Sequence, residues 1–173
     1  LTLQKGNNQD IYSYNLISKE LNRLTSDTSV DQQANFSPDG MNIVFTSNRS
    51  GKNQLHIMNL KSRAVYRIPT KNHIGSKSNP VFSPDGEKIA FIQGIDKDKR
   101  LALYDIRSNS LRIVTKNSLD SSPSFSPSGE WLIFETKKMD RDILTIFSLP
   151  LNQVVELMMA DGNVGDPSWL NYS

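Results

Sequence analysis

A five-residue segment, Phe36-Ser37-Pro38-Asp39-Gly40, recurs along this chain and constrains its fold more than any other feature. It returns at residues 82–86 as Phe-Ser-Pro-Asp-Gly and at residues 125–129 as Phe-Ser-Pro-Ser-Gly, and an aromatic residue in the same phase follows at Trp169. The aromatic positions 36, 82, 125 and 169 are separated by 46, 43 and 44 residues. Periods of this length are typical of arrays of supersecondary units.

Each middle repeat contains four short apolar runs, several of which alternate with polar residues. Such runs predict half-buried antiparallel strands, and four strands per repeat is the arrangement of a propeller blade. We therefore expect an all-β protein, a β-propeller of four-stranded antiparallel blades, with about four blades' worth of sequence. The predicted repeats are residues 1–25 together with 166–173, 33–70, 79–115, and 122–158.

The Ser-Pro-Asp-Gly segment has the composition of a tight turn. Proline presets φ, aspartate tolerates the next position, and glycine accepts a left-handed conformation. We expect this turn to join the first strand of each blade to the second, and the preceding aromatic residue to pack between blades. Pro80, Pro123 and Pro167 lie just upstream, and we expect them to hold the residues before them in an extended conformation. Those residues are Asn79, Ser122 and Asp166.

The two ends of the chain together complete the repeat. Residues 1–25 supply a second, third and fourth strand without a first, and residues 166–170 supply a first strand alone. The sequence therefore permits two arrangements, a closed four-bladed ring whose termini share a blade, or an open arc of a larger ring. Because the chain opens on Leu1 and carries no signal peptide, we expect it to be a processed or trimmed piece.

Composition excludes several classes of function. There is no apolar run near the roughly 20 residues that a membrane-spanning helix needs. The chain has no cysteine, hence no disulfide framework and no thiolate metal site. A net charge of +2 is too small to indicate nucleic-acid binding, and no aromatic platform is interleaved with the basic residues.

The repeats resemble the TolB-type propeller family. The resemblance is carried by the Phe-Ser-Pro-Asp-Gly segments and by the stretches at residues 43–51 and 55–60, and more specifically by residues 118–125, 160–164 and 166–169. It implies a non-enzymatic, periplasmic adaptor of the Tol-Pal system that binds the lipoprotein Pal and supports outer-membrane integrity and cell division. Family members have an amino-terminal α/β domain and six blades. This chain has neither, so we expect no TolA contact, which belongs to the missing amino-terminal region, and weaker Pal binding.

Loops that lead into each first strand converge on one face of a propeller, where such scaffolds often carry function. These loops are predicted at residues 26–33, 71–79, 116–122 and 160–166. In the family this face resembles the Pal-docking surface, although the same polar residues can also simply solvate loops. The matching positions are Asp31, Gln32, Gln33, Lys77, Ser78, Asn79, Asp120, Ser121 and Ser122.

Carboxylates at this face raise a weak calcium hypothesis. Asp31 and Asp120 share one phase of the repeat, and Asp166 lies nearby, so their oxygens could suit a hard cation. No compact loop with closely spaced ligands supports such a site, and a structural role is favoured. We therefore expect no cofactor.

A basic run without acidic residues extends from Arg49 to Pro84, and Lys77 is its last basic residue. It could attract an acidic partner or the anionic cell envelope. A solvated outer strand, protected by lysine from edge pairing, is the favoured interpretation.

Catalytic motifs are absent, and the two histidines, His56 and His73, occupy a predicted strand and a loop. One enzyme-related alternative stays open. Similar blades form the gating propeller of prolyl-oligopeptidase-like serine peptidases, whose catalytic domain would lie outside this chain. A scaffold propeller with another protein ligand is the third alternative.

Overall fold

The computed structural model describes residues 1–70, 75–116, 119–157 and 165–169 and contains only antiparallel sheets in those ranges. The first sheet has three strands, and each of the other three has four, paired in chain order. The strands of the first sheet are β1 (Thr2–Lys5), β2 (Asn8–Tyr14) and β3 (Leu21–Arg23). The second sheet comprises β4 (Asp31–Phe36), β5 (Asn42–Ser47), β6 (Gln54–Asn59) and β7 (Val65–Arg67). The third comprises β8 (Ser76–Phe82), β9 (Lys88–Ile95), β10 (Asp98–Asp105) and β11 (Ser110–Ile113), and the fourth β12 (Asp120–Phe125), β13 (Trp131–Lys138), β14 (Arg141–Ser148) and β15 (Gln153–Leu157). The prediction of four-stranded antiparallel blades is confirmed.

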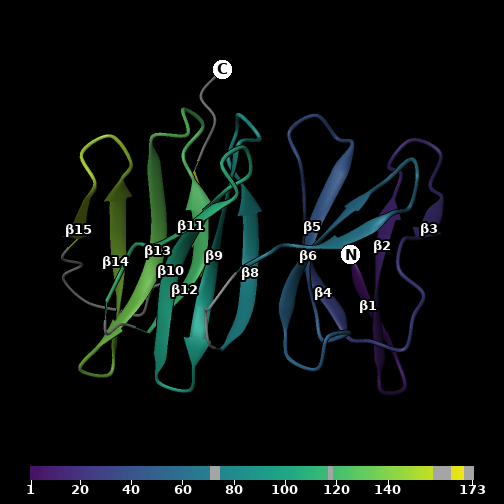
Figure 1. The fold of residues 1–173 in the computed structure, drawn as a ribbon, viewed down its shortest axis with the longest axis horizontal. Coiled ribbons are helices and arrows are strands. Elements are labelled where there is room, and N and C mark those ends of the chain that lie inside the picture. The colour runs from purple at the N-terminus through teal and green to yellow at the C-terminus, as the bar shows by residue number, and fades with distance from the viewer. Residues whose placement is uncertain (71–74, 117–118, 158–164, 170–173) are drawn as a thin grey trace.

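The four sheets stand side by side as an open arc, running from the purple β1–β3 sheet to the green β12–β15 sheet (Figure 1). The first strands β4, β8 and β12 contact one another in sequence and thereby line the inner side of the arc. No described strand of the first sheet contacts one of the last sheet. Of the two arrangements that the sequence permitted, the described residues adopt the open arc.

The described residues near the carboxyl end do not join the first sheet. Instead, the indole Nε1 of Trp169 donates a hydrogen bond to the carbonyl oxygen of Ser124 in β12, at 3.1 Å. This segment therefore lies against the fourth sheet, beside its first strand.

The recurring turn has the predicted conformation. Gly40 has φ of 68°, and its amide donates to the carbonyl oxygen of Ser37 at 2.9 Å. The Ser37 hydroxyl and the Met41 amide both donate to Oδ1 of Asp39, at 2.5 and 2.9 Å. Asp85 repeats these contacts in the next copy, so the segment is a hairpin turn that is closed by its own side chains.

Core clusters lie mainly between neighbouring sheets. One joins the second and third sheets around Phe91, and Phe82 packs against it. Another joins the third and fourth sheets around Phe134, and Phe125 packs against it. Phe36, by contrast, is 55% exposed, and the prediction that it packs between blades is wrong. Its side chain belongs to none of the hydrophobic clusters formed by the described residues.

One residue of each first strand has a left-handed backbone. Gln33, Asn79 and Ser122 have φ of 56°, 51° and 48°, and Asp166 in the last repeat has φ of 44°. The predicted extended conformation of Asn79, Ser122 and Asp166 is therefore wrong. In the three complete blades the pairing register shifts here, between residues 32 and 35, 78 and 81, and 121 and 124. A β-bulge imposes this conformation, and Gln33 shows that no following proline is required.

Candidate partner-binding groove

A groove of about 380 Å³ runs along the inner side of the arc, where the bulged residues of successive blades meet. Three neighbouring residues from each first strand, together with two residues of the last repeat, line it. They are Gln33, Ala34, Asn35, Asn79, Pro80, Val81, Ser122, Pro123, Ser124, Asp166 and Pro167. The groove therefore follows from the repeat, since each bulge turns its side chains away from the regular pleat.

The bulges of the second and third sheets are joined by a side-chain amide. Oε1 of Gln33 accepts hydrogen bonds from the Thr46 hydroxyl at 3.1 Å and from the backbone amide of Asn79 at 3.0 Å. Asn35 adds a second link, because its Oδ1 accepts from the amide of Phe82 at 3.0 Å. These bonds fix one wall of the groove.

A carboxylate makes the corresponding link at the fourth sheet. Glu135 accepts from the Ser121 hydroxyl at 2.7 Å and from the amide of Asp166, while the Ser122 hydroxyl donates to Oδ1 of Asp166 at 2.8 Å. The sequence reasoning missed Glu135 and Thr46, which occupy the same phase of the second strand. That shared phase was the signal that could have found them.

The nine residues predicted at the partner-binding face fall into three classes by position. Gln33, Asn79 and Ser122 line the groove, and Gln32, Ser78 and Ser121 are half-buried beside it. Asp31, Lys77 and Asp120 are buried. All nine lie in first strands, which begin earlier than predicted, and not in loops. Parts of the predicted loops, at residues 71–74, 117–118 and 160–164, lie outside the described residues. Partner contact by these residues stays a prediction.

Asp31 is held by internal partners. Its side chain is fully buried, and its carboxylate accepts from Arg49 at 2.8 Å and from the Ser29 hydroxyl at 3.0 Å. Arg49 is also paired with Asp27 at 2.9 Å. Part of the basic run is therefore neutralised by acidic residues that precede it in the sequence.

Asp120 and Lys77 occupy the same repeat position in the next two blades. Asp120 bridges two sheets, because its carboxylate accepts from the amide of Leu101 at 2.8 Å and from the Thr136 hydroxyl at 2.9 Å. The Lys77 ammonium donates to Oε1 of Gln54 at 2.8 Å, and burial lowers the pKa of this lysine. This position therefore connects strands within the scaffold.

The calcium hypothesis gains no ligand set from these side chains. In the part of the chain that the structure describes, no three acidic or histidine residues group closely enough to hold a metal ion. Asp31 and Asp120 lie on different blades, and each carboxylate already accepts hydrogen bonds from protein donors. Calcium at this face stays a hypothesis.

His56 is a core residue of β6, only 3% exposed, with its ring 5.8 Å from that of Phe45. Burial, followed by the charge of Arg49, lowers its pKa from the ordinary value of 6.5. The second histidine, His73, lies outside the described residues.

We expect His56 to make stability depend on pH. Since its folded-state pKa is lowered, the unfolded chain binds more protons as pH falls below about 6.5, and the free energy of unfolding declines there, by less than about 1.4 kcal/mol per pH unit. Urea denaturation between pH 5 and pH 8 measures this slope. The His56→Gln variant, which cannot titrate, should show a shallower slope, and identical slopes would refute the assignment.

Comparison with known proteins identifies the family. The family model for the TolB beta propeller domain matches residues 1–173. This chain belongs to the TolB propeller family. The Tol-Pal system protein TolB of Ruthia magnifica subsp. Calyptogena magnifica is 45% identical over 172 residues, which are 99% of this chain and 40% of that protein. The crystal structure of TolB from Acinetobacter baumannii matches 96% of this chain and 42% of its own, with a TM-score of 0.85 and 31% identity. The chain thus spans about two fifths of the length of these TolB proteins.

The peptidase alternative is supported only at the level of fold. A puromycin-hydrolyzing peptidase of Mycobacterium tuberculosis matches 86% of this chain and 24% of its own, with a TM-score of 0.67 and 12% identity. Similarity at that identity shows a shared propeller architecture.

Among its described residues, this TolB propeller has no helix long and apolar enough to cross a membrane.

Proposed function

We propose that this chain is the propeller part of a periplasmic Tol-Pal protein, non-enzymatic in itself, that binds a Pal-like lipoprotein and thereby supports outer-membrane integrity and cell division. The observation that carries the proposal is the inner groove formed by the bulged residues of successive first strands. The chain's membership of the TolB propeller family, and its 45% sequence identity to a TolB protein over 172 residues, support the choice of partner class.

The chemistry of the groove suits a polypeptide ligand. In the described part of the chain, the side-chain amide of Asn79 makes no hydrogen bond, and Oε1 is the only side-chain atom of Gln33 that makes one. Amides of this kind both donate and accept, as a peptide backbone requires. Pro167, which is half-buried, adds apolar contact surface, whereas Pro80 and Pro123 line the groove but are themselves buried. Because the walls are tied together by hydrogen bonds, the ligand would meet a preformed site.

Removing single groove side chains tests this function. We expect Asn79→Gly and Ser122→Gly each to weaken binding of the periplasmic domain of the cognate Pal-like lipoprotein by about fivefold, in line with loss of a hydrogen bond. Glycine accepts the left-handed backbone of both positions, so the bulge is preserved. Isothermal titration calorimetry measures the affinity.

A matched control is Lys19→Gly, which also replaces a left-handed residue, but in the exposed turn between β2 and β3. Its affinity should equal that of the unmodified chain. Unchanged affinity of both groove variants would remove the groove from the interface. No binding by the complete gene product would overturn the adaptor function itself.

A further inference from the structure

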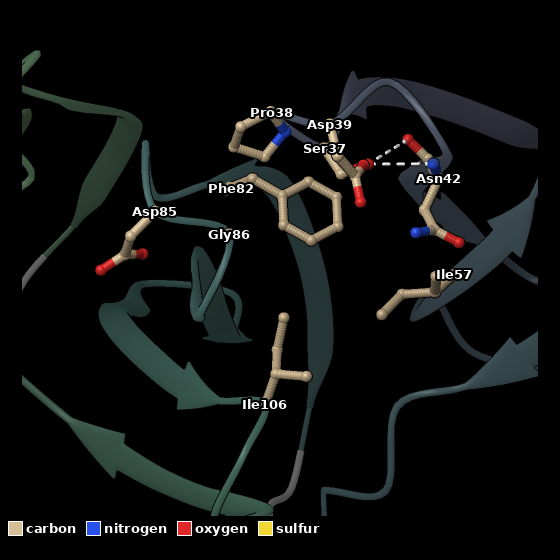
Figure 2. A pocket seen from close by; sticks show the side chains of 9 residues that line it. All are labelled: Ser37, Pro38, Asp39, Asn42, Ile57, Phe82, Asp85, Gly86 and Ile106. Atoms are coloured by element: carbon tan, nitrogen blue, oxygen red, sulfur yellow. Dashed lines mark hydrogen bonds between the residues drawn. The ribbon is translucent and has the colours of Figure 1, made fainter.

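A second pocket lies at the other end of the first strands, between the recurring turns of the second and third sheets. Its volume is about 550 Å³. Figure 2 shows the Phe82 ring at its centre, with the Ser37–Asp39 turn on one side and Ile57 and Ile106 on the other. Ile57 and Phe82 are half-buried and Ile106 is 36% exposed, so the pocket offers apolar surface that protein side chains only partly cover.

Two carboxylates stand at the rim of this apolar pocket. Asp39 and Asp85 belong to successive copies of the turn, and the two residues line the pocket from opposite sides (Figure 2). The hydrogen bond from Ser37, then that from the Met41 amide, lowers the pKa of Asp39. Burial works against ionisation of Asp85, but its hydrogen bonds from Ser83 and Glu87 hold its pKa below the ordinary value. Both groups are therefore negatively charged at neutral pH.

Only one oxygen of each carboxylate is used in the turn. Oδ1 of Asp39 accepts the bonds from Ser37 and Met41, and Oδ1 of Asp85 accepts those from Ser83 and Glu87. Within the described part of the chain, Oδ2 of either residue makes no hydrogen bond or ion pair. Each rim carboxylate can thus accept a further donor without loss of the turn.

The equivalent position between the third and fourth sheets carries different charged residues. There, by repeat phase, Lys88 stands in place of Asn42, and Ser128 stands in place of Asp85. Of the two turn residues at that position, Asp85 and Ser128, only Asp85 has a carboxylate. The positive charge of Lys88 contributes to the lowered pKa of Asp85. A rim with two carboxylates is thus a property of the pocket between the second and third sheets, and not of the repeat.

We propose that this pocket binds a lysine or arginine side chain from a basic segment of a partner polypeptide. Such side chains place their aliphatic stem along apolar surface and keep the charged end at a polar rim, which is the arrangement that Phe82, Ile57 and the two aspartates provide. Charge complementarity selects this occupant over an acidic or a purely apolar one. The site is separate from the inner groove and does not depend on its function.

An NMR titration of the 173-residue chain tests the proposal with two matched probes. The probes are acetyl-leucyl-arginine amide and the same peptide with citrulline, which has nearly the shape of arginine but no charge. We expect the arginine peptide to shift the amide signals of Asn42, Ile57, Phe82 and Gly86, and to bind about fivefold more tightly than the citrulline peptide. Equal affinity of the two peptides would overturn the proposal.

Isosteric variants locate the charge. Asp39→Asn combined with Asp85→Asn keeps the Oδ1 acceptors of both turns and should weaken the arginine peptide about fivefold, with the citrulline peptide unaffected. The control Asp140→Asn removes one carboxylate from the exposed β13–β14 turn at the other end of the sheets and should change neither affinity. Retention of full affinity in the double variant would also overturn the proposal.

Discussion

The Phe91→Ala variant is expected to lose about 4 kcal/mol of unfolding free energy, the typical cost of removing a buried aromatic ring. Phe91 is fully buried in β9, at the centre of the cluster that joins the second and third sheets. Its neighbours there include Val44 and Leu55 from one sheet and Ala102 from the other. Alanine would leave a cavity between two blades, which a rigid pair of sheets cannot close. Urea denaturation followed by circular dichroism measures the loss.

Phe36→Ala is the matched control, since the same side chain is 55% exposed there. We expect its stability to fall by less than about 1 kcal/mol. Comparable losses in the two variants would show that the first sheet covers Phe36 in solution and would contradict the exposed position described above.

The second large effect is expected at Asp120, where alanine should lower the free energy of unfolding by about 3 kcal/mol. Removal of this buried carboxylate leaves the donors that it accepts from, including the Thr136 hydroxyl, without that acceptor. It also breaks the bond to the Leu101 amide, which joins the third and fourth sheets. Asp120→Asn, which keeps the shape and one acceptor, should show an intermediate loss. Glu130→Ala, at an exposed position, should stay within about 0.5 kcal/mol of the unmodified chain.

The same variants separate a structural role from a binding role. If Asp120 acts through the scaffold, stability falls while the folded protein keeps its affinity for a partner. Reduced affinity with unchanged stability would instead assign Asp120 to the contact surface. The same comparison applies to Asp31, whose carboxylate is paired with Arg49.

The architecture could be predicted because its determinants are local and repeated. The Ser-Pro-Asp-Gly turns fix where each first strand ends, since proline and glycine restrict the backbone whatever the surroundings. Alternating apolar residues then place the remaining strands. Both signals involve residues close together in the sequence, so they can be recognised without knowledge of the tertiary structure.

The site was harder to predict because burial depends on neighbours. Asp31, Lys77 and Asp120 look like polar loop residues, yet all three are buried, since each first strand begins before its apolar run. The bulge residue Asn79 precedes a proline, a context that favours extended backbone, but the pairing with β9 overrides this preference. The exposure of Phe36 likewise depends on the sheet beside it, which no local pattern describes.

The open arc also determines how the molecule shares its stability. Because each sheet, as far as the described strands show, contacts only the sheets beside it in sequence, cooperativity passes from blade to blade, as in a linear array of repeats. Each middle sheet has two packed neighbours, whereas a terminal sheet has one, so fraying should begin at the two ends. Amide hydrogens of β9, whose central residues are fully buried, would then exchange with solvent more slowly than those of the exposed β1.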